Sequence, residues 1–438
     1  MLSDTATVGG WTAAIKVGGA VKVILAARLF GAGDAMDAYL IAFLLPCFLA
    51  DVLAGPLDSA LIPTYIELRE KQQKAAAEAV YATVLASASG ALFAAAIAVA
   101  TLSGLLLPAI ASSFAGGKLA FTQRLLLLMI VLAPLSGLSS TWRAILNSEH
   151  RFAIAARVPA ITPIVSIAAL LMAGRRYGVV TLAAATVVGG ILETVAMGVG
   201  VKRAGHALLP RWGGMSPALR QVANQYAPLV AITLVTTGSA LLDQAMAARL
   251  GPGSVSALSY GTRLMGVLVA IAPTAVGTAV LPHISAGASL REPEAARRTL
   301  RTYGLLVLAA ILPAIAVLMY FSEPIVRILF QQGAFGESAT KLVAAVQTVS
   351  LLQVPAAVLL ALEIRLSSAV KRNRVLYRVA ALTLLATAGG DALFMRWWGV
   401  AGIPLAGTLV RLVSSLYLSR KMSSPGGKRS GFPPTDPL

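Results

Sequence analysis

Charged residues inside long apolar segments constrain this chain more than any other feature. Of its 438 residues, 57% are hydrophobic, and the mean hydropathy is +0.79. The apolar runs are long enough to span a bilayer, whose core about 20 helical residues cross. A charge at that depth costs roughly 2.5–3.5 kcal/mol even on a lenient scale, so it persists only where it faces water or another charge. We therefore predict a wet, polar interior around the charged residues of these runs, which are Lys16, Lys22, Asp37, Asp51, Asp58, Glu193, Asp243, Arg263, Glu363 and Asp391.

The hydropathy pattern predicts an all-α polytopic membrane protein with about 12 transmembrane helices. Several spans exceed about 25 residues, which implies tilt or kinks. The first span is the least apolar because it holds Lys16 and Lys22. The expected spans lie near 10–30, 35–64, 80–110, 123–145, 153–174, 178–201, 222–249, 254–284, 303–322, 338–366, 375–395 and 398–419.

The distribution of basic residues predicts the orientation. The net charge is +18, from 36 Lys and Arg against 18 Asp and Glu. In a soluble protein this balance would suggest nucleic acid as a partner. Here the basic residues gather in the short loops after every second span, as the positive-inside rule describes. We expect both termini in the cytoplasm, no nucleic-acid partner, no cleaved signal peptide, and a disordered cytoplasmic tail at 423–438 because that segment is rich in Ser, Gly and Pro.

Two stretches of the chain resemble each other. Ala26–Gly33 reads AARLFGAG and Ala247–Gly253 reads AARLGPG, and an aliphatic residue followed by proline comes later in each half, at Pro63 and Pro282. Both pairs are separated by close to half the chain, which suggests a duplicated unit. Repeats with an even number of spans are parallel and hold substrate between them. We therefore predict an N-terminal six-helix lobe at 1–210 and a C-terminal six-helix lobe at 211–422 around a central cavity.

Basic residues in the spans are candidates for binding an anionic substrate. Lys16 and Lys22 flank a Gly-Gly pair in the first span, and lysine presents a compact charge suited to phosphate. Arg263 lies among small and hydroxylated residues, and its guanidinium can clamp phosphate with two hydrogen bonds. Arg28, at the end of the first span, is a further substrate-binding candidate. The alternatives are that the lysines extend to the interface, that Arg28 is an interfacial anchor, and that Arg263 pairs with an aspartate.

Acidic residues in the spans are candidates for ion coupling. Asp51 and Asp58 are seven positions apart and nearly eclipse on a helix. The Gly55-Pro56 pair between them is expected to break the helix, and a broken helix at membrane depth must line a cavity or be buried in protein. A salt bridge to a lysine is the alternative for both carboxylates. Asp243 aligns with Lys22 in the duplication, whereas Asp37 either joins the substrate site or caps its own helix.

Motif searches give no indication of an enzyme. The chain has no GxxxxGK[ST], HExxH, CxxC or GxSxG pattern, so neither ATP binding nor hydrolytic chemistry is indicated. Its one cysteine, Cys47, excludes a multi-cysteine metal site, and its three histidines argue against a metal enzyme. We predict a transporter without a cofactor, driven by the membrane potential or by a coupling ion of unknown identity.

Several segments, in the same order along nearly the whole chain, match the motifs of one known family. They are Ala27–Gly33, Asp37–Tyr39, Arg143–Asn147, Gly253–Tyr260, Arg263–Met265 and Leu329–Phe335. With these segments the chain resembles the MviN/MurJ family of lipid II flippases, in the multidrug/oligosaccharidyl-lipid/polysaccharide exporter superfamily. The resemblance implies two six-helix lobes around a central cavity, and substrate roles for Lys16, Lys22, Asp37 and Arg263. The family typically has arginines in the first span, where this chain has lysines, and two further C-terminal helices.

The resemblance and the basic first span together predict a flippase of the bacterial inner membrane. Its cargo would be an undecaprenyl-pyrophosphate-linked saccharide, lipid II first, with an exopolysaccharide or O-antigen unit as the alternative. Membrane lipids and proteins of cell-envelope synthesis are the expected partners. Three other functions are alternatives. A cation-coupled drug exporter would favour an acidic cavity, and a glycosyltransferase would need carboxylates in outward loops. A non-transporting scaffold would show no flipping.

Overall fold

The computed structural model describes residues 2–269, 305, 308–309, 311–369 and 373–423. Within these ranges every regular element is helical, which confirms the predicted all-α fold class. The α-helices are α1 (Leu2–Phe30), α2 (Asp34–Leu49), α3 (Leu57–Glu70), α4 (Lys74–Thr101), α5 (Ser103–Ile110), α6 (Gly116–Met129), α7 (Leu132–Ser148), α8 (Phe152–Arg157), α9 (Ile161–Tyr177), α10 (Val179–Arg203), α11 (Pro217–Ala247), α12 (Ser254–Gly261), α15 (Ser322–Phe330), α16 (Glu337–Leu351), α17 (Gln353–Ala369), α18 (Asn373–Trp398) and α19 (Gly402–Ser423).

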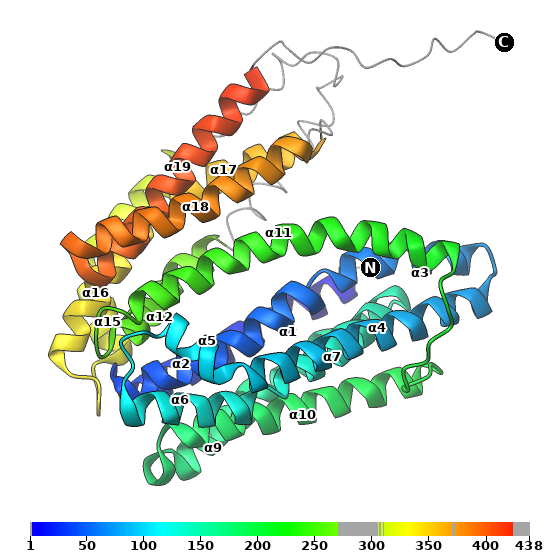
Figure 1. The fold of residues 1–438 in the computed structure, drawn as a ribbon, viewed down its shortest axis with the longest axis horizontal. Helices are drawn as coiled ribbons and strands as arrows, with labels where there is room; N and C mark the ends of the chain where they lie inside the picture. The colour runs from blue at the N-terminus through cyan, green and yellow to red at the C-terminus, as the bar shows by residue number, and fades with distance from the viewer. Residues whose placement is uncertain (1, 270–304, 306–307, 310, 370–372, 424–438) are drawn as a thin grey trace.

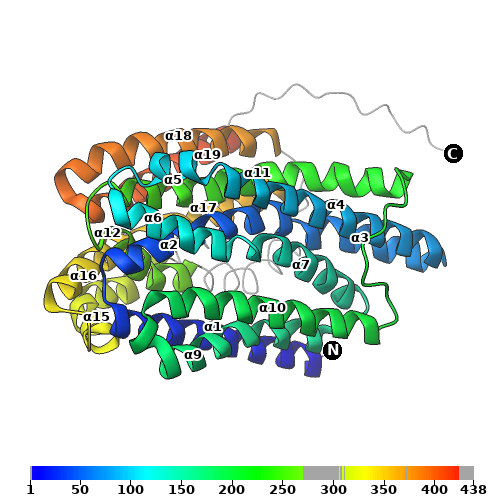
Figure 2. The same ribbon diagram turned by 60° about the horizontal axis from the view of Figure 1, so that its bottom comes forward.

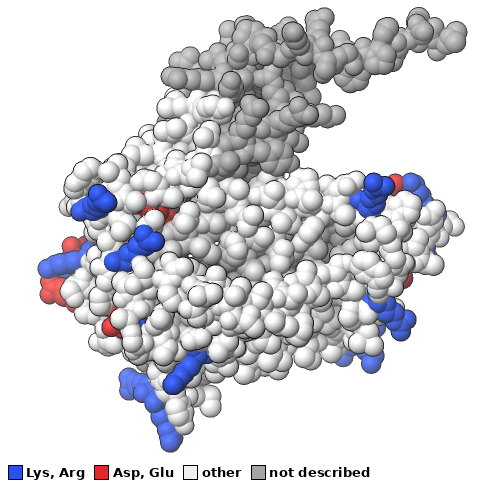
Figure 3. Space-filling view, in the orientation of Figure 1, with Lys and Arg blue, Asp and Glu red and all other residues white. Residues whose placement is uncertain are grey.

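The helices are those of a multi-pass membrane protein, but the count of 12 is not confirmed. Eight of the described helical segments are long and apolar enough to cross a membrane, or nine if Ile311–Tyr320 and Ser322–Phe330, bent by 61°, form one broken span. The first predicted span, within α1, is not among the eight. Parts of the spans predicted at 254–284 and 303–322 lie outside the described residues. Figure 3 shows described charges mainly at the two ends of the molecule, with an almost uncharged band between them.

Helices α1–α10 form one bundle, in which α9 packs along α10, α4 along α7, and α2 along α6 (Figures 1 and 2). A buried apolar cluster, which includes Leu61, Leu85 and Ile145, lies between α3, α4 and α7. The bundle ends with α10, and residues 204–216 connect it to α11. The lobe boundary predicted at residue 210 remains a prediction, and it falls within this connection.

The helices from α12 onward meet the N-terminal bundle at one end of the molecule. We call this the closed end and define it by the first residues of α2, α12 and α16, which are Asp34, Ser254 and Glu337 (Figure 1). A second buried apolar cluster combines Ile41 of α2 with Val255 of α12 and with Phe335, just before α16. From the closed end, α17, α18 and α19 diverge from the N-terminal bundle, and both the start of α1 and the end of α19 lie away from the closed end (Figure 1).

The expected break near Gly55 and Pro56 takes the form of a π-helical segment, η1 (Ala50–Ala54), between α2 and α3. The amide of Gly55 donates to the carbonyl of Ala50, so the helical path from Asp34 to Glu70 continues through a bulge. A π-bulge inserts one residue into a helix and often marks a functional site. It leaves Asp51 exposed and Asp58 partly buried.

Candidate functional site

Lys22 and Arg263 bring positive charge to one place from the two halves of the chain. Lys22 lies in α1, and Arg263 begins the helical residues 263–269 that follow α12. The two side chains lie close enough for their like charges to repel each other. Arg263 is exposed and Lys22 is partly buried. Among the described residues neither side chain forms an ion pair with a carboxylate, so both charges are available to an anion.

The last turn of α2, just before the π-bulge, lies near these two cations. The thiol of Cys47, in the last turn of α2, lies within electrostatic reach of Lys22, Arg263 and Asp51. We call Lys22 and Arg263 the cation pair. Two cations without a described acidic partner suit a ligand that carries two negative charges, such as a diphosphate.

No described contact links Lys16 to the cation pair. It is exposed on α1, six residues before Lys22, and therefore about 9 Å away along the helix axis. No described carboxylate forms an ion pair with it. Its place in substrate binding therefore remains a prediction.

Arg28 acts at the closed end. Its guanidinium donates to the carbonyls of Leu329 (3.0 Å) and Ile328 (3.2 Å), near the C-terminus of α15. A cation is favourable there because the last carbonyls of a helix lack partners within it and carry partial negative charge. The backbone carbonyl of Arg28 also accepts from the amide of Ala334 at 2.9 Å. These contacts make Arg28 a clamp between α1 and α15 in this conformation. Its roles as a substrate ligand and as an interfacial anchor both remain predictions.

Asp37 is also part of the closed end. Its side chain is 0% exposed, and its carboxylate accepts from the amides of Gly253 (2.7 Å) and Ser256 (2.8 Å) at the start of α12. Asp37 thus caps a helix of the other lobe and not its own. Lys118 adds an ion pair with Asp37 at 3.5 Å. In this conformation Asp37 cannot touch a substrate, because no part of its side chain is accessible.

The structure pairs Asp58 with an arginine and not with the lysine that was the alternative expectation. Arg143 Nε lies 3.2 Å from Asp58 Oδ2, and the guanidinium also donates to Ser140. The other oxygen of Asp58 is buried and has no described hydrogen-bond partner. Asp51 forms no described ion pair. Arg143 stands in one of the family's motifs, but its pairing with Asp58 could not be predicted, because the two residues are 85 positions apart.

Asp243 belongs to a second polar cluster, within the C-terminal helices. Its carboxyl interacts with that of Asp391 in α18, and Arg411 of α19 lies within electrostatic reach. Both oxygens of Asp391 are buried, and neither makes a hydrogen bond of ordinary geometry to a described residue. Arg411 donates to the side-chain oxygen of Gln353. Arg411 and Gln353 were missed because they lie in ordinary apolar runs with no motif around them.

Comparisons with known proteins agree with this architecture. A family model described as lipid II flippase MurJ matches residues 26–429. The lipid II flippase MurJ of Burkholderia cenocepacia is 30% identical over 356 residues, which cover 77% of this chain and 67% of that protein. A probable lipid II flippase MurJ of Rhizobium tropici is 27% identical over 368 residues, with 81% and 68% covered.

Solved structures share the fold. A lipid II flippase MurJ in an inward closed conformation superposes with a TM-score of 0.82 at 20% identity, covering 95% of this chain and 87% of that one. An inward-facing multidrug transporter of the MATE family gives a TM-score of 0.74 at 13% identity, with 93% and 94% covered. The family model spans most of the chain, from within α1 to beyond α19. This chain therefore belongs to the MurJ family of lipid II flippases.

Proposed function

We propose that this protein moves lipid II across the bacterial inner membrane for cell-wall synthesis. Lipid II joins a polyprenyl tail to a saccharide through a diphosphate. The single observation that carries the proposal is the cation pair, in which Lys22 and Arg263 offer two charges from two lobes. Hydrogen bonds from cations to phosphate are charge-assisted and therefore among the stronger ones. Membership of the MurJ family supports lipid II as the cargo.

The transport cycle that we propose is alternating access. The diphosphate would bind the cation pair while the polyprenyl tail stays in lipid. The contacts of Asp37 and Arg28 across the closed end would then separate and release the head group on the other side. Because Lys22 and Arg263 come from different lobes, a bound diphosphate would draw the lobes together around it.

We place both termini in the cytoplasm. In that orientation the closed end faces outward, because both the start of α1 and the end of α19 lie away from it (Figure 1). A negative interior then drives an anionic head group outward, and each charge that crosses the full field contributes about 2.3 kcal/mol per 100 mV. Proteins of cell-envelope synthesis remain the proposed protein partners.

Ion coupling remains a second proposal within the same function. Of the three carboxylates considered for it, Asp58 is paired with Arg143, whereas Asp51 is exposed and forms no described ion pair. Asp243 is the strongest candidate, because a second carboxyl, that of Asp391, faces it inside the bundle. Two adjacent buried carboxyls favour the uptake of a cation or a proton.

Two experiments test the cargo. The gene should restore growth to a strain depleted of its lipid II flippase, and the purified protein in liposomes should move lipid II between leaflets. Flipping of an exopolysaccharide or O-antigen lipid without flipping of lipid II would replace the proposed cargo. Drug efflux without lipid movement would support an exporter, and no transport of any kind would support a scaffold.

A further inference from the structure

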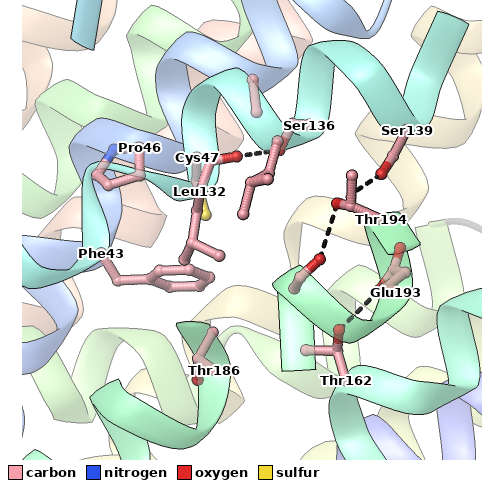
Figure 4. A pocket seen from close by; sticks show the side chains of 13 residues that line it. Phe43, Pro46, Cys47, Leu132, Ser136, Ser139, Thr162, Thr186, Glu193 and Thr194 are labelled. Carbon is pink, nitrogen blue, oxygen red and sulfur yellow. Dashed lines mark hydrogen bonds between the residues drawn. The ribbon is translucent and has the colours of Figure 1, made fainter. Parts of the chain in front are cut away.

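A cavity of about 170 Å³ lies inside the N-terminal bundle, between α2, α7, α9 and α10 (Figure 4). We call it the side pocket. A single water needs only about 10–15 Å³ of such space, so the side pocket can take a larger group. The residues that line it are Phe43, Pro46, Cys47, Ala50, Leu132, Leu135, Ser136, Ser139, Thr162, Thr186, Gly190, Glu193 and Thr194.

The lining combines one carboxylate with hydroxyl groups from three helices. Glu193 Oε2 accepts from the hydroxyl of Thr162 at 2.6 Å, and this bond fixes the carboxylate at the pocket (Figure 4). The hydroxyls of Ser139 and Thr194 pair at 3.0 Å. A carboxylate accepts several hydrogen bonds, and a hydroxyl can both donate and accept. Glu193 sits in the middle of α10, where a charge is costly unless it serves a wet or liganded site.

The rest of the lining is apolar, and it includes an aromatic ring. Phe43 borders the side pocket from α2, and its ring stacks on Tyr39 with a centroid distance of 5.8 Å. Ligand pockets typically combine apolar walls with a few convergent polar groups that orient the ligand. A sugar ring matches this lining, because its C–H faces are apolar and its edge carries hydroxyls.

The side pocket adjoins the cation pair. Cys47 lines the pocket, and its thiol is within electrostatic reach of both Lys22 and Arg263. A second connection runs through Tyr39, which shares a 3.4 Å hydrogen bond with Thr186 of the pocket and lies within electrostatic reach of Arg263. A group bonded to a diphosphate on the cation pair therefore lies next to the pocket.

We propose that the side pocket binds the sugar ring directly attached to the diphosphate of the cargo, with Glu193 accepting hydrogen bonds from that sugar. This inference rests on the proposed function, since it requires a lipid-linked saccharide on the cation pair. The cation pair recognises only the charge of the diphosphate, which every polyprenyl pyrophosphate carries. The side pocket adds recognition of the saccharide, so the protein favours loaded carrier lipid over carrier lipid that has lost its sugar.

Equilibrium binding to two lipids tests the proposal. Purified protein in detergent is titrated with undecaprenyl pyrophosphate, which has no sugar, and with lipid II. We expect Glu193→Gln to weaken lipid II binding about tenfold or more, because hydrogen bonds to a charged acceptor are lost. Binding of undecaprenyl pyrophosphate should stay unchanged, which also shows that the variant is folded. Ser139→Ala should show the same selective loss to a smaller degree.

A matched control is Glu337→Gln, which neutralises an exposed carboxylate at the start of α16, and it should bind both lipids as the parent does. Equal weakening of both lipids by Glu193→Gln, or no weakening of either, would overturn the side pocket as a sugar site. If the parent protein binds neither lipid, the proposed function fails, and the role of the side pocket fails with it.

Discussion

Replacement of Asp37 by asparagine should shift the protein away from the conformation described here. The carboxylate of Asp37 accepts two backbone hydrogen bonds from the start of α12, at 2.7 and 2.8 Å, inside a fully buried contact. Asparagine retains one acceptor oxygen and turns an N–H₂ group toward an amide that also donates. Hydrogen bonds to a charged group contribute about 1.5–3 kcal/mol each.

We expect the closed end to lose about 2–3 kcal/mol of stability, because one of these bonds disappears together with the charge. Each 1.4 kcal/mol is a factor of ten, so the ratio of open to closed molecules at this end should rise roughly 30- to 150-fold. Lipid flipping should slow as well, because alternating access requires both states to be populated.

Distances between spin labels at Ala35 and Ser338, measured in liposomes after Cys47→Ser, report this equilibrium, since both positions are exposed at the closed end. The matched control is Asp34→Asn. Asp34 is 59% exposed and pairs with Lys118 at 2.6 Å. Exposed ion pairs contribute at most about 1 kcal/mol. If Asp37→Asn opens the closed end no more than Asp34→Asn does, the two buried hydrogen bonds of Asp37 do not hold this end closed.

Two further predictions concern stability. Gly261→Ala should lower the melting temperature, because the added carbon would lie 2.6 Å from the stiff side chain of Val346 and would overpack the contact by about 1–3 kcal/mol. Gly266→Ala, with no described atom within 4 Å of the added carbon, should not lower the melting temperature, because alanine favours the helix. Equal losses of stability in the two variants would show that the contact with Val346 is not the cause. A double-mutant cycle of Asp58→Asn and Arg143→Gln, read from thermal unfolding, should give a coupling of about 1 kcal/mol for this half-buried pair; a coupling near zero would show that the pair contributes nothing.

The fold class and the cationic character of the interior follow from local features of the sequence. Long apolar runs dictate membrane helices, and the charges at Lys22 and Arg263 are conspicuous within them. The number of membrane-spanning helices was harder to predict from the sequence, because α1 is less apolar than an ordinary span and other spans are bent or interrupted. At η1 the sequence indicated an interruption, but a turn and a π-bulge have the same Gly-Pro signal.

The partners of the charged residues were beyond the sequence. The capping of α12 by Asp37 joins residues 216 and 219 positions apart, and backbone amides leave no trace in the side-chain pattern. The clamp made by Arg28 on α15 could not be predicted for the same reason, because Arg28 donates to backbone carbonyls 300 and 301 positions away. Glu193 was visible as a charge in an apolar run, but its hydroxyl neighbours converge only when α7, α9 and α10 pack together.

In the transport cycle that we propose, positive charges from both lobes bind the diphosphate of the cargo. The most direct test is the affinity of the purified protein for undecaprenyl pyrophosphate after Lys22→Gln, Arg263→Gln and, as a control, Lys341→Gln, which neutralises a lysine on the surface of α16. Each substitution in the cation pair should weaken binding about tenfold or more, and Lys22→Arg should largely restore it. Unchanged affinity in both Lys22→Gln and Arg263→Gln would contradict the account.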